Sequence, residues 1–69
     1  MLMTDPWAGR AYVKAIKGIG WRGQERVVAY EVVRDGQQLA VYEINRKRTW
    51  RVSLALANLL RDDANAGIS

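Results

Sequence analysis

The chain has 69 residues, a net charge of +4 at neutral pH, and neither cysteine nor histidine. This length supports one small domain, residues 1–69, whose marginal core would gain from dimerisation. The missing residue types exclude disulfide bonds, typical zinc sites and the usual cysteine or histidine chemistry of hydrolases. We therefore expect no cofactor, no metal and no catalytic residues, and a protein that is not an enzyme.

Two negative features bear on where the protein resides. No stretch approaches the roughly 18 consecutive apolar residues of a membrane-spanning helix. Residues 1–7 also lack the basic and apolar regions of a secretory signal. We expect a cytoplasmic protein without a membrane partner, which the absence of cysteine also favours.

The first third of the chain predicts one strand between irregular segments. Residues 1–9 contain a proline and a glycine and predict an irregular lead-in. Residues 10–17 predict a strand with Ala11, Val13 and Ala15 on one face. Three glycines in residues 18–23 then predict a loop.

Residues 26–34 and 39–45 predict two further strands, and Asp35-Gly36 between them predicts a hairpin. Two registers are possible. With only Asp35 and Gly36 in the turn, Glu43 would fall on the more apolar face. With a three-residue turn that also includes Gln37, an uncharged face forms. That face, which we prefer, contains Val28, Tyr30, Val32, Ala40, Tyr42 and Ile44. The other face is still apolar enough to suggest that something covers it.

Residues 49–63 have the apolar spacing of a helix. Thr49 suits the N-cap because its hydroxyl can accept from the first free N–H groups, and Asn45 is the alternative start. One apolar arc is expected to pack on the sheet. The arc contains Val52, Ala55, Leu56, Leu59 and Leu60. Residues 64–69 are expected to form a mobile tail.

A second stripe lies on the opposite side of the expected helix and contains Trp50, Leu54, Ala57 and Arg61. One interpretation is an interface with a second copy or another partner, because buried aromatic residues dominate interface energetics. The other is that Trp50 folds over the preceding loop and that Leu54 is an isolated exposed leucine.

The start of the helix is strongly basic, with Arg46, Lys47, Arg48 and Arg51 around Trp50. A helix N-terminus already carries unpaired N–H groups and a partial positive charge, so cations there are mildly destabilising unless an anion binds. Nucleic-acid phosphates or an acidic protein surface would supply the anion. A solvated charge run is the remaining interpretation.

The glycine-rich loop offers a second basic element. Its sequence matches the glycine fingerprint of dinucleotide-binding folds, but a strand rather than a helix follows, so the match is accidental. Lys17 and Arg22 could instead neutralise phosphates while Trp21 stacks on a base. The competing interpretation is that Trp21 covers the core from the loop.

The segments 29–32, 35–37 and 53–60 lie within a span of about half of the chain. Their pattern resembles the three-stranded DNA-binding domains of plant transcription factors and the arm-binding domains of tyrosine integrases. The resemblance implies a sheet that enters the major groove. The outward face expected here departs from it, since Val27, Val33, Leu39 and Val41 lie there with two glutamates. The basic loop and helix start are then the better candidates for contact.

We therefore expect an α+β fold, a three-stranded antiparallel meander packed on one C-terminal helix. We also expect a homodimer, formed through the Trp50 stripe or through the half-apolar face of the sheet. The expected function is non-enzymatic nucleic-acid binding, with DNA or RNA as partner. The alternative is a small inhibitor or adaptor of the kind phages use, which docks on a larger protein or ribonucleoprotein.

Overall fold

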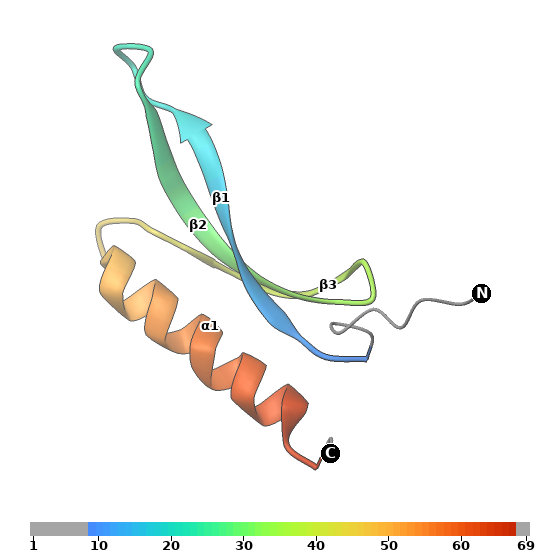
Figure 1. Cartoon of the computed structure of the whole chain (residues 1–69). Helices are drawn as coiled ribbons and strands as arrows, with labels where there is room; N and C mark the ends of the chain where they lie inside the picture. The colour runs from blue at the N-terminus through green and yellow to red at the C-terminus, as the bar shows by residue number, and fades with distance from the viewer. Residues whose placement is uncertain (1–8, 68–69) are drawn as a thin grey trace, which may run out of the picture.

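The computed structural model describes residues 9–67, which form three strands and one helix. They are β1 (Tyr12–Ile19), β2 (Glu25–Arg34), β3 (Gln37–Glu43) and α1 (Trp50–Asn65). The antiparallel sheet has the order β1-β2-β3, and α1 lies across one of its faces (Figure 1). The predicted α+β meander with a C-terminal helix is confirmed. The expected lead-in, apart from Gly9, lies outside the described residues.

The turn between β2 and β3 has two residues, because Arg34 pairs directly with Gln37. Asp35 and Gly36 both have positive φ, 50° and 77°. Such turns match the twist of the flanking strands, and they favour glycine because a side chain at positive φ meets the backbone. The expected three-residue turn is therefore wrong.

The preferred face nevertheless forms, because β3 contains a bulge. Leu39 is an extra residue between the pairs Val33–Gln38 and Val32–Ala40. The bulge shifts the rest of β3 by one residue and so exchanges its two faces. Tyr42 consequently lies opposite Tyr30, as in the register that the sequence favoured.

The end of the β1–β2 hairpin extends beyond β3 (Figure 1). β3 ends at Glu43, opposite Ala29, whereas β1 and β2 stay paired as far as Ile19 and Glu25. We call residues 17–28 the hairpin arm. The expected loop began at residue 18, but Gly18 lies within β1. A Cβ at Gly18 would lie 2.9 Å from Cγ1 of Val28, so the close approach of this side chain accounts for a glycine inside the strand.

Small side chains of α1 face the sheet. Ser53 and Ala57 are both fully buried. Ala57 forms the core with Ala11 and Val32, and Tyr30 and Tyr42 are among the partly buried residues packed against it. Small residues on the helix let its backbone come close to a sheet that already carries these two rings.

The prediction that the apolar arc packs on the sheet is wrong for most of its members. Leu60 does pack against the core. Val52 and Leu59 are 48% and 67% exposed, and Ala55 is exposed as well. The helix is rotated about its axis relative to the expectation, so that Val52, Ala55 and Leu59 point away from the sheet while Leu60 stays against it.

Polar contacts near both ends hold α1 in this rotation. The hydroxyl of Ser53 donates to the carbonyl of Glu43 over 2.8 Å. Near the other end, the Asn65 side chain accepts from the Ala11 N–H over 2.7 Å and donates to the Ala11 carbonyl over 2.9 Å. The apolar arc could face the sheet only if these bonds broke.

The helix also continues through residues that were expected to be a mobile tail. Ala64 packs against the core, and its carbonyl accepts a 2.5 Å hydrogen bond from Nη2 of Arg34. Asn65 is the last helical residue. The helix therefore extends two residues past the predicted end at residue 63, and the Arg34 side chain, from the sheet, satisfies a carbonyl near its C-terminus. Residues 68–69 lie outside the described residues.

Candidate functional site

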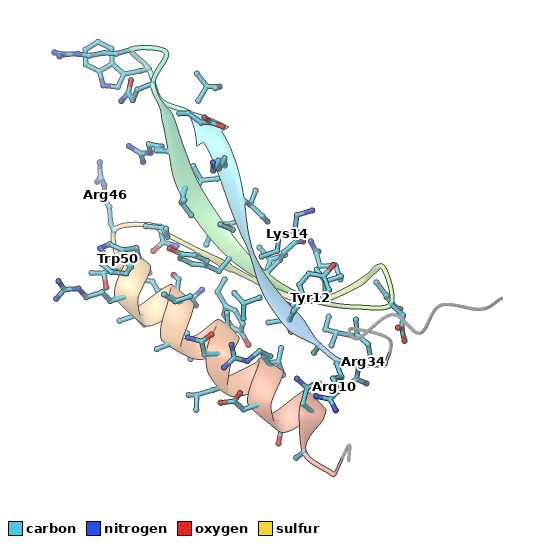
Figure 2. The ribbon with its side chains drawn as sticks, viewed as in Figure 1. Arg10, Tyr12, Lys14, Arg34, Arg46 and Trp50 are labelled. Carbon is cyan, nitrogen blue, oxygen red and sulfur yellow. The ribbon has the colours of Figure 1, made fainter. Side chains whose placement is uncertain are left out.

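A tight turn with two exposed cations connects β3 to α1. The backbones of Asn45 and Arg48 exchange two hydrogen bonds, 2.9 and 3.2 Å long. Oδ1 of Asn45 also accepts from the N–H of Lys47 over 2.9 Å. Arg46 and Lys47 thus occupy the two central positions and are exposed. We call residues 45–48 the basic turn. In Figure 2, Arg46 points away from α1, on the side of the hairpin arm.

The helix starts directly after the basic turn. Thr49 is the N-cap, as predicted, and its Oγ1 accepts from the N–H of Val52 over 3.4 Å. The first turn of α1 contains no acidic residue. The positive end of the helix dipole therefore lies next to the basic turn without a carboxylate of its own turn to offset it.

Two further arginines of this segment lie on aromatic rings. The guanidinium carbon of Arg48 is 5.7 Å from the ring centre of Tyr42, and that of Arg51 is 5.3 Å from the ring centre of Trp50. Such contacts orient a guanidinium group without neutralising its charge. Both arginines therefore keep their charge for a ligand.

Among residues 9–67, the one ion pair joins Arg61 to Asp62, with 2.9 Å between Nη2 and Oδ1. Arg46, Lys47 and Arg51 thus have no carboxylate partner in the described part of the chain. An external anion would lower their mutual repulsion.

The tip of the hairpin arm carries an exposed tryptophan. Trp21 is 86% exposed, and the guanidinium carbon of Arg22 lies 4.7 Å from its ring centre. Two backbone hydrogen bonds close the loop, from Gly20 N–H to Gln24 and from Gly23 N–H to Gly20, of 2.7 and 2.8 Å. The interpretation that Trp21 covers the core is therefore wrong, because the arm carries it away from the helix.

The topology brings the loop and the basic turn to one end of the sheet. β1 ends, β2 begins and β3 ends at this end, since neighbouring strands are antiparallel. Lys17 lies in the arm and is exposed, although it belongs to β1 rather than to the loop.

Sequence analysis missed one cation here. Arg26 pairs with Gly18 in the arm and is exposed, and only its place at the start of a predicted strand could have indicated it.

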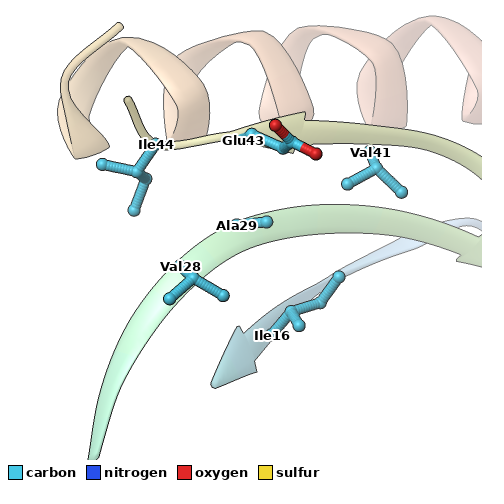
Figure 3. Close-up of a pocket in the computed structure, with 6 residues that line it drawn as sticks. All are labelled: Ile16, Val28, Ala29, Val41, Glu43 and Ile44. Atoms are coloured by element: carbon cyan, nitrogen blue, oxygen red, sulfur yellow. The ribbon is translucent and has the colours of Figure 1, made fainter. Parts of the chain in front are cut away.

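An open depression of about 370 Å³ lies at the base of the arm (Figure 3). Its lining is apolar except for Glu43 and comprises Ile16, Val28, Ala29, Val41, Glu43 and Ile44. A carboxylate repels phosphate, so the depression is not part of the cationic surface. Glu31, on the same face as Val41, accepts a 2.5 Å hydrogen bond from Gln38 Nε2.

The stripe expected to form a partner interface is not a continuous surface. Trp50 is half exposed, but Ala57 is fully buried in the core. Leu54 is partly buried, and Arg61 is paired with Asp62. The rotation of α1 places Ala57 against the sheet, so it cannot contact a partner in this structure.

Comparison with protein-family models, with curated proteins and with solved structures found no match. Over the described range, no helix has the length and hydrophobicity required to cross a membrane. Nor do residues 9–67 bring three acidic side chains together in a way that could hold a metal ion.

Proposed function

We propose that this protein is a non-enzymatic nucleic-acid-binding module that contacts phosphates with the cations at one end of its sheet. The observation that carries the proposal is the juxtaposition of the basic turn with the hairpin arm, together with the lack of carboxylate partners for Arg46 and Lys47 within residues 9–67. A polyanion that spans the two elements would neutralise both.

The two elements have different roles in this proposal. Arg46 and Lys47, at the tip of a hydrogen-bonded turn, bind phosphate oxygens, and Arg48 and Arg51 add charge beside them. In the arm, Lys17, Arg22 and Arg26 follow the backbone of the nucleic acid, while Trp21 provides a flat surface on which a base stacks. Phosphate contacts position the ligand, so we expect weak dependence on base sequence.

A second candidate is a protein-binding inhibitor or adaptor. The exposed apolar residues on the outer side of α1, Val52 and Leu59, favour it, because they offer an apolar surface beside a charged one. This candidate predicts that generic nucleic acids do not bind at near-physiological salt.

The test is fluorescence anisotropy with labelled duplex DNA, single-stranded DNA and single-stranded RNA over a range of salt concentrations. We expect the logarithm of the association constant to fall linearly with the logarithm of salt concentration. The double variant Arg46→Ala, Lys47→Ala should lower the affinity for all three ligands and reduce the salt slope by about two. Arg48 is left intact because it lies on the ring of Tyr42, so its replacement could alter packing as well as binding.

The matched control removes the same charge from the opposite end of β1. Arg10 and Lys14 are exposed and lie away from the basic turn, as Figure 2 shows. Arg10→Ala with Lys14→Ala should change the affinity much less than the double variant of the basic turn. Equal losses in the two double variants would contradict the proposed site, and no binding by the unmodified protein would contradict the function.

A further inference from the structure

The outer side of α1 presents an apolar stripe with no covering element among residues 9–67. Val52, Ala55 and Leu59 are all exposed. At 100° per residue they lie within about 60° of one another around the helix axis. These are the residues whose spacing predicted the core side of the helix. We call them the outer stripe.

Charges at the two ends of the outer stripe have opposite signs. Arg51 lies beside its N-terminal end, after the basic turn. Asp62 and Asp63 lie at its C-terminal end, and the last turn of α1 contains no basic residue. Each end thus has the charge that the helix dipole disfavours. An antiparallel contact that places the positive end of one helix beside the negative end of another would offset both unfavourable charges.

We propose that the outer stripe binds the same stripe of a second copy, with the two helices antiparallel. A two-fold axis beside Ala55 places Val52 opposite the partner's Leu59, and the small side chain of Ala55 lets the helix backbones approach. Arg51 then lies on the same flank as the partner's Asp62, displaced by about 3 Å along the axis. An arginine side chain spans that displacement easily.

The contacts of Asp62 within the chain leave room for this pair. Both hydrogen bonds from Arg61, from Nε and Nη2, go to Oδ1, and the side chain of Asp62 is 68% exposed. Oδ2 therefore has no partner among the described residues and can accept from the partner's Arg51. The pairing is made twice in a symmetric dimer, so the contact is complementary to itself in both shape and charge.

This inference does not rest on nucleic-acid binding. It replaces the dimer contact that the sequence suggested through Trp50 and Ala57 with one on the other side of the helix. Arg51 is the single residue shared with the proposed binding surface, and the variants at Arg46 and Lys47 leave the dimer contact intact.

The first test is sedimentation equilibrium of the full chain from low micromolar to about millimolar concentration. We expect the apparent mass to rise from 7.8 kDa towards twice that value. Leu59→Glu should raise the dissociation constant of the dimer more than about tenfold, because the symmetric contact would bury the new carboxylate twice. Ile19→Glu alters a similarly exposed apolar residue in the arm, 74% exposed against 67% for Leu59, and should have no effect on the dissociation constant. Circular dichroism verifies that each variant is folded.

The second test uses the absence of cysteine from the chain, so that an introduced thiol is the only one. Ala55→Cys should form a covalent dimer under mild oxidation, because the two-fold axis brings the two thiols within disulfide distance. Ala66→Cys should not, because antiparallel packing separates its two copies by about 30 Å. A chain that stays monomeric at all concentrations, or equal cross-linking at the two positions, would overturn the proposal.

Discussion

The side-chain amide of Asn65 forms two hydrogen bonds with the backbone of Ala11, one to its N–H and one to its carbonyl. The contact joins residues 54 positions apart. It satisfies both polar groups of a residue that is itself buried in the core. The end of α1 is thereby attached to the start of the sheet.

Replacing Asn65 by alanine should lower the free energy of unfolding by about 2 to 3 kcal/mol, because the buried N–H and carbonyl of Ala11 lose their partner together. Asn65→Asp keeps the acceptor but loses the donor, sets a carboxylate oxygen against the Ala11 carbonyl and adds negative charge at the helix C-terminus, so it should not restore the lost stability. Urea denaturation followed by circular dichroism measures both. A loss below about 0.5 kcal/mol for the alanine variant would show that water replaces the amide.

The rotation of α1 gives a prediction that runs against the hydrophobicity of the residues. Ala57→Leu should destabilise the fold by about 1 to 3 kcal/mol, since Ala57 is fully buried and the larger leucine side chain has no space between helix and sheet. Leu59→Ala should change the stability by less than about 0.5 kcal/mol when measured at concentrations where the chain is monomeric. Had the apolar arc faced the sheet, Leu59→Ala would destabilise the fold more than Ala57→Leu.

The elements and their order were predictable because their signals are local. Alternating valine and tyrosine residues mark the strands, and Thr49 precedes the helix as its cap. The rotation of the helix was not predictable in the same way. It depends on Ser53 and Asn65, whose partners lie in other elements, and no periodicity in the helix sequence reports on them.

In the candidate site, too, some features were predictable from the local sequence and others depend on contacts between distant residues. The charges of the basic turn were evident from the sequence, whereas its geometry depends on the bonds between Asn45 and Arg48. The exposure of Trp21 also required the structure, because the length of the hairpin arm follows from where β3 stops. Arg26 became a candidate only when the arm placed it near the other cations.

The bulge at Leu39 predicts that one residue can be removed from the middle of the hairpin. Without Leu39 the two-residue turn leads directly into the pairs Val32–Ala40 and Tyr30–Tyr42, so every side chain after the bulge keeps its face. We expect the deletion variant to fold, with a stability within about 1 kcal/mol of the parent protein.

The control for this prediction is deletion of Val32 from the central strand. That change shifts the register against both neighbouring strands and removes a core residue, so it should abolish cooperative unfolding. Thermal denaturation followed by circular dichroism compares the two deletions. If deletion of Leu39 unfolds the chain as thoroughly as deletion of Val32, the extra residue is required for the turn, and the assigned role of the bulge is wrong.

Trp21 separates a binding role from a structural one, because its side chain is almost completely exposed. Trp21→Ala should leave the free energy of unfolding within about 0.5 kcal/mol of the parent value. If a base stacks on the indole ring, the same change should weaken binding to single-stranded DNA or RNA by about 1 to 3 kcal/mol, or roughly 5- to 150-fold. Binding to duplex DNA, whose bases are already stacked, should weaken less.

Trp21→Phe supplies the matched comparison, since it keeps a flat aromatic surface at the same place in the arm. We expect it to recover most of the affinity that alanine loses. Anisotropy titrations at one fixed salt concentration compare the three proteins without a change in net charge. Equal affinities for single strands in the alanine and parent proteins would remove Trp21 from the binding surface and leave the cations of the basic turn and the arm as its only contributors.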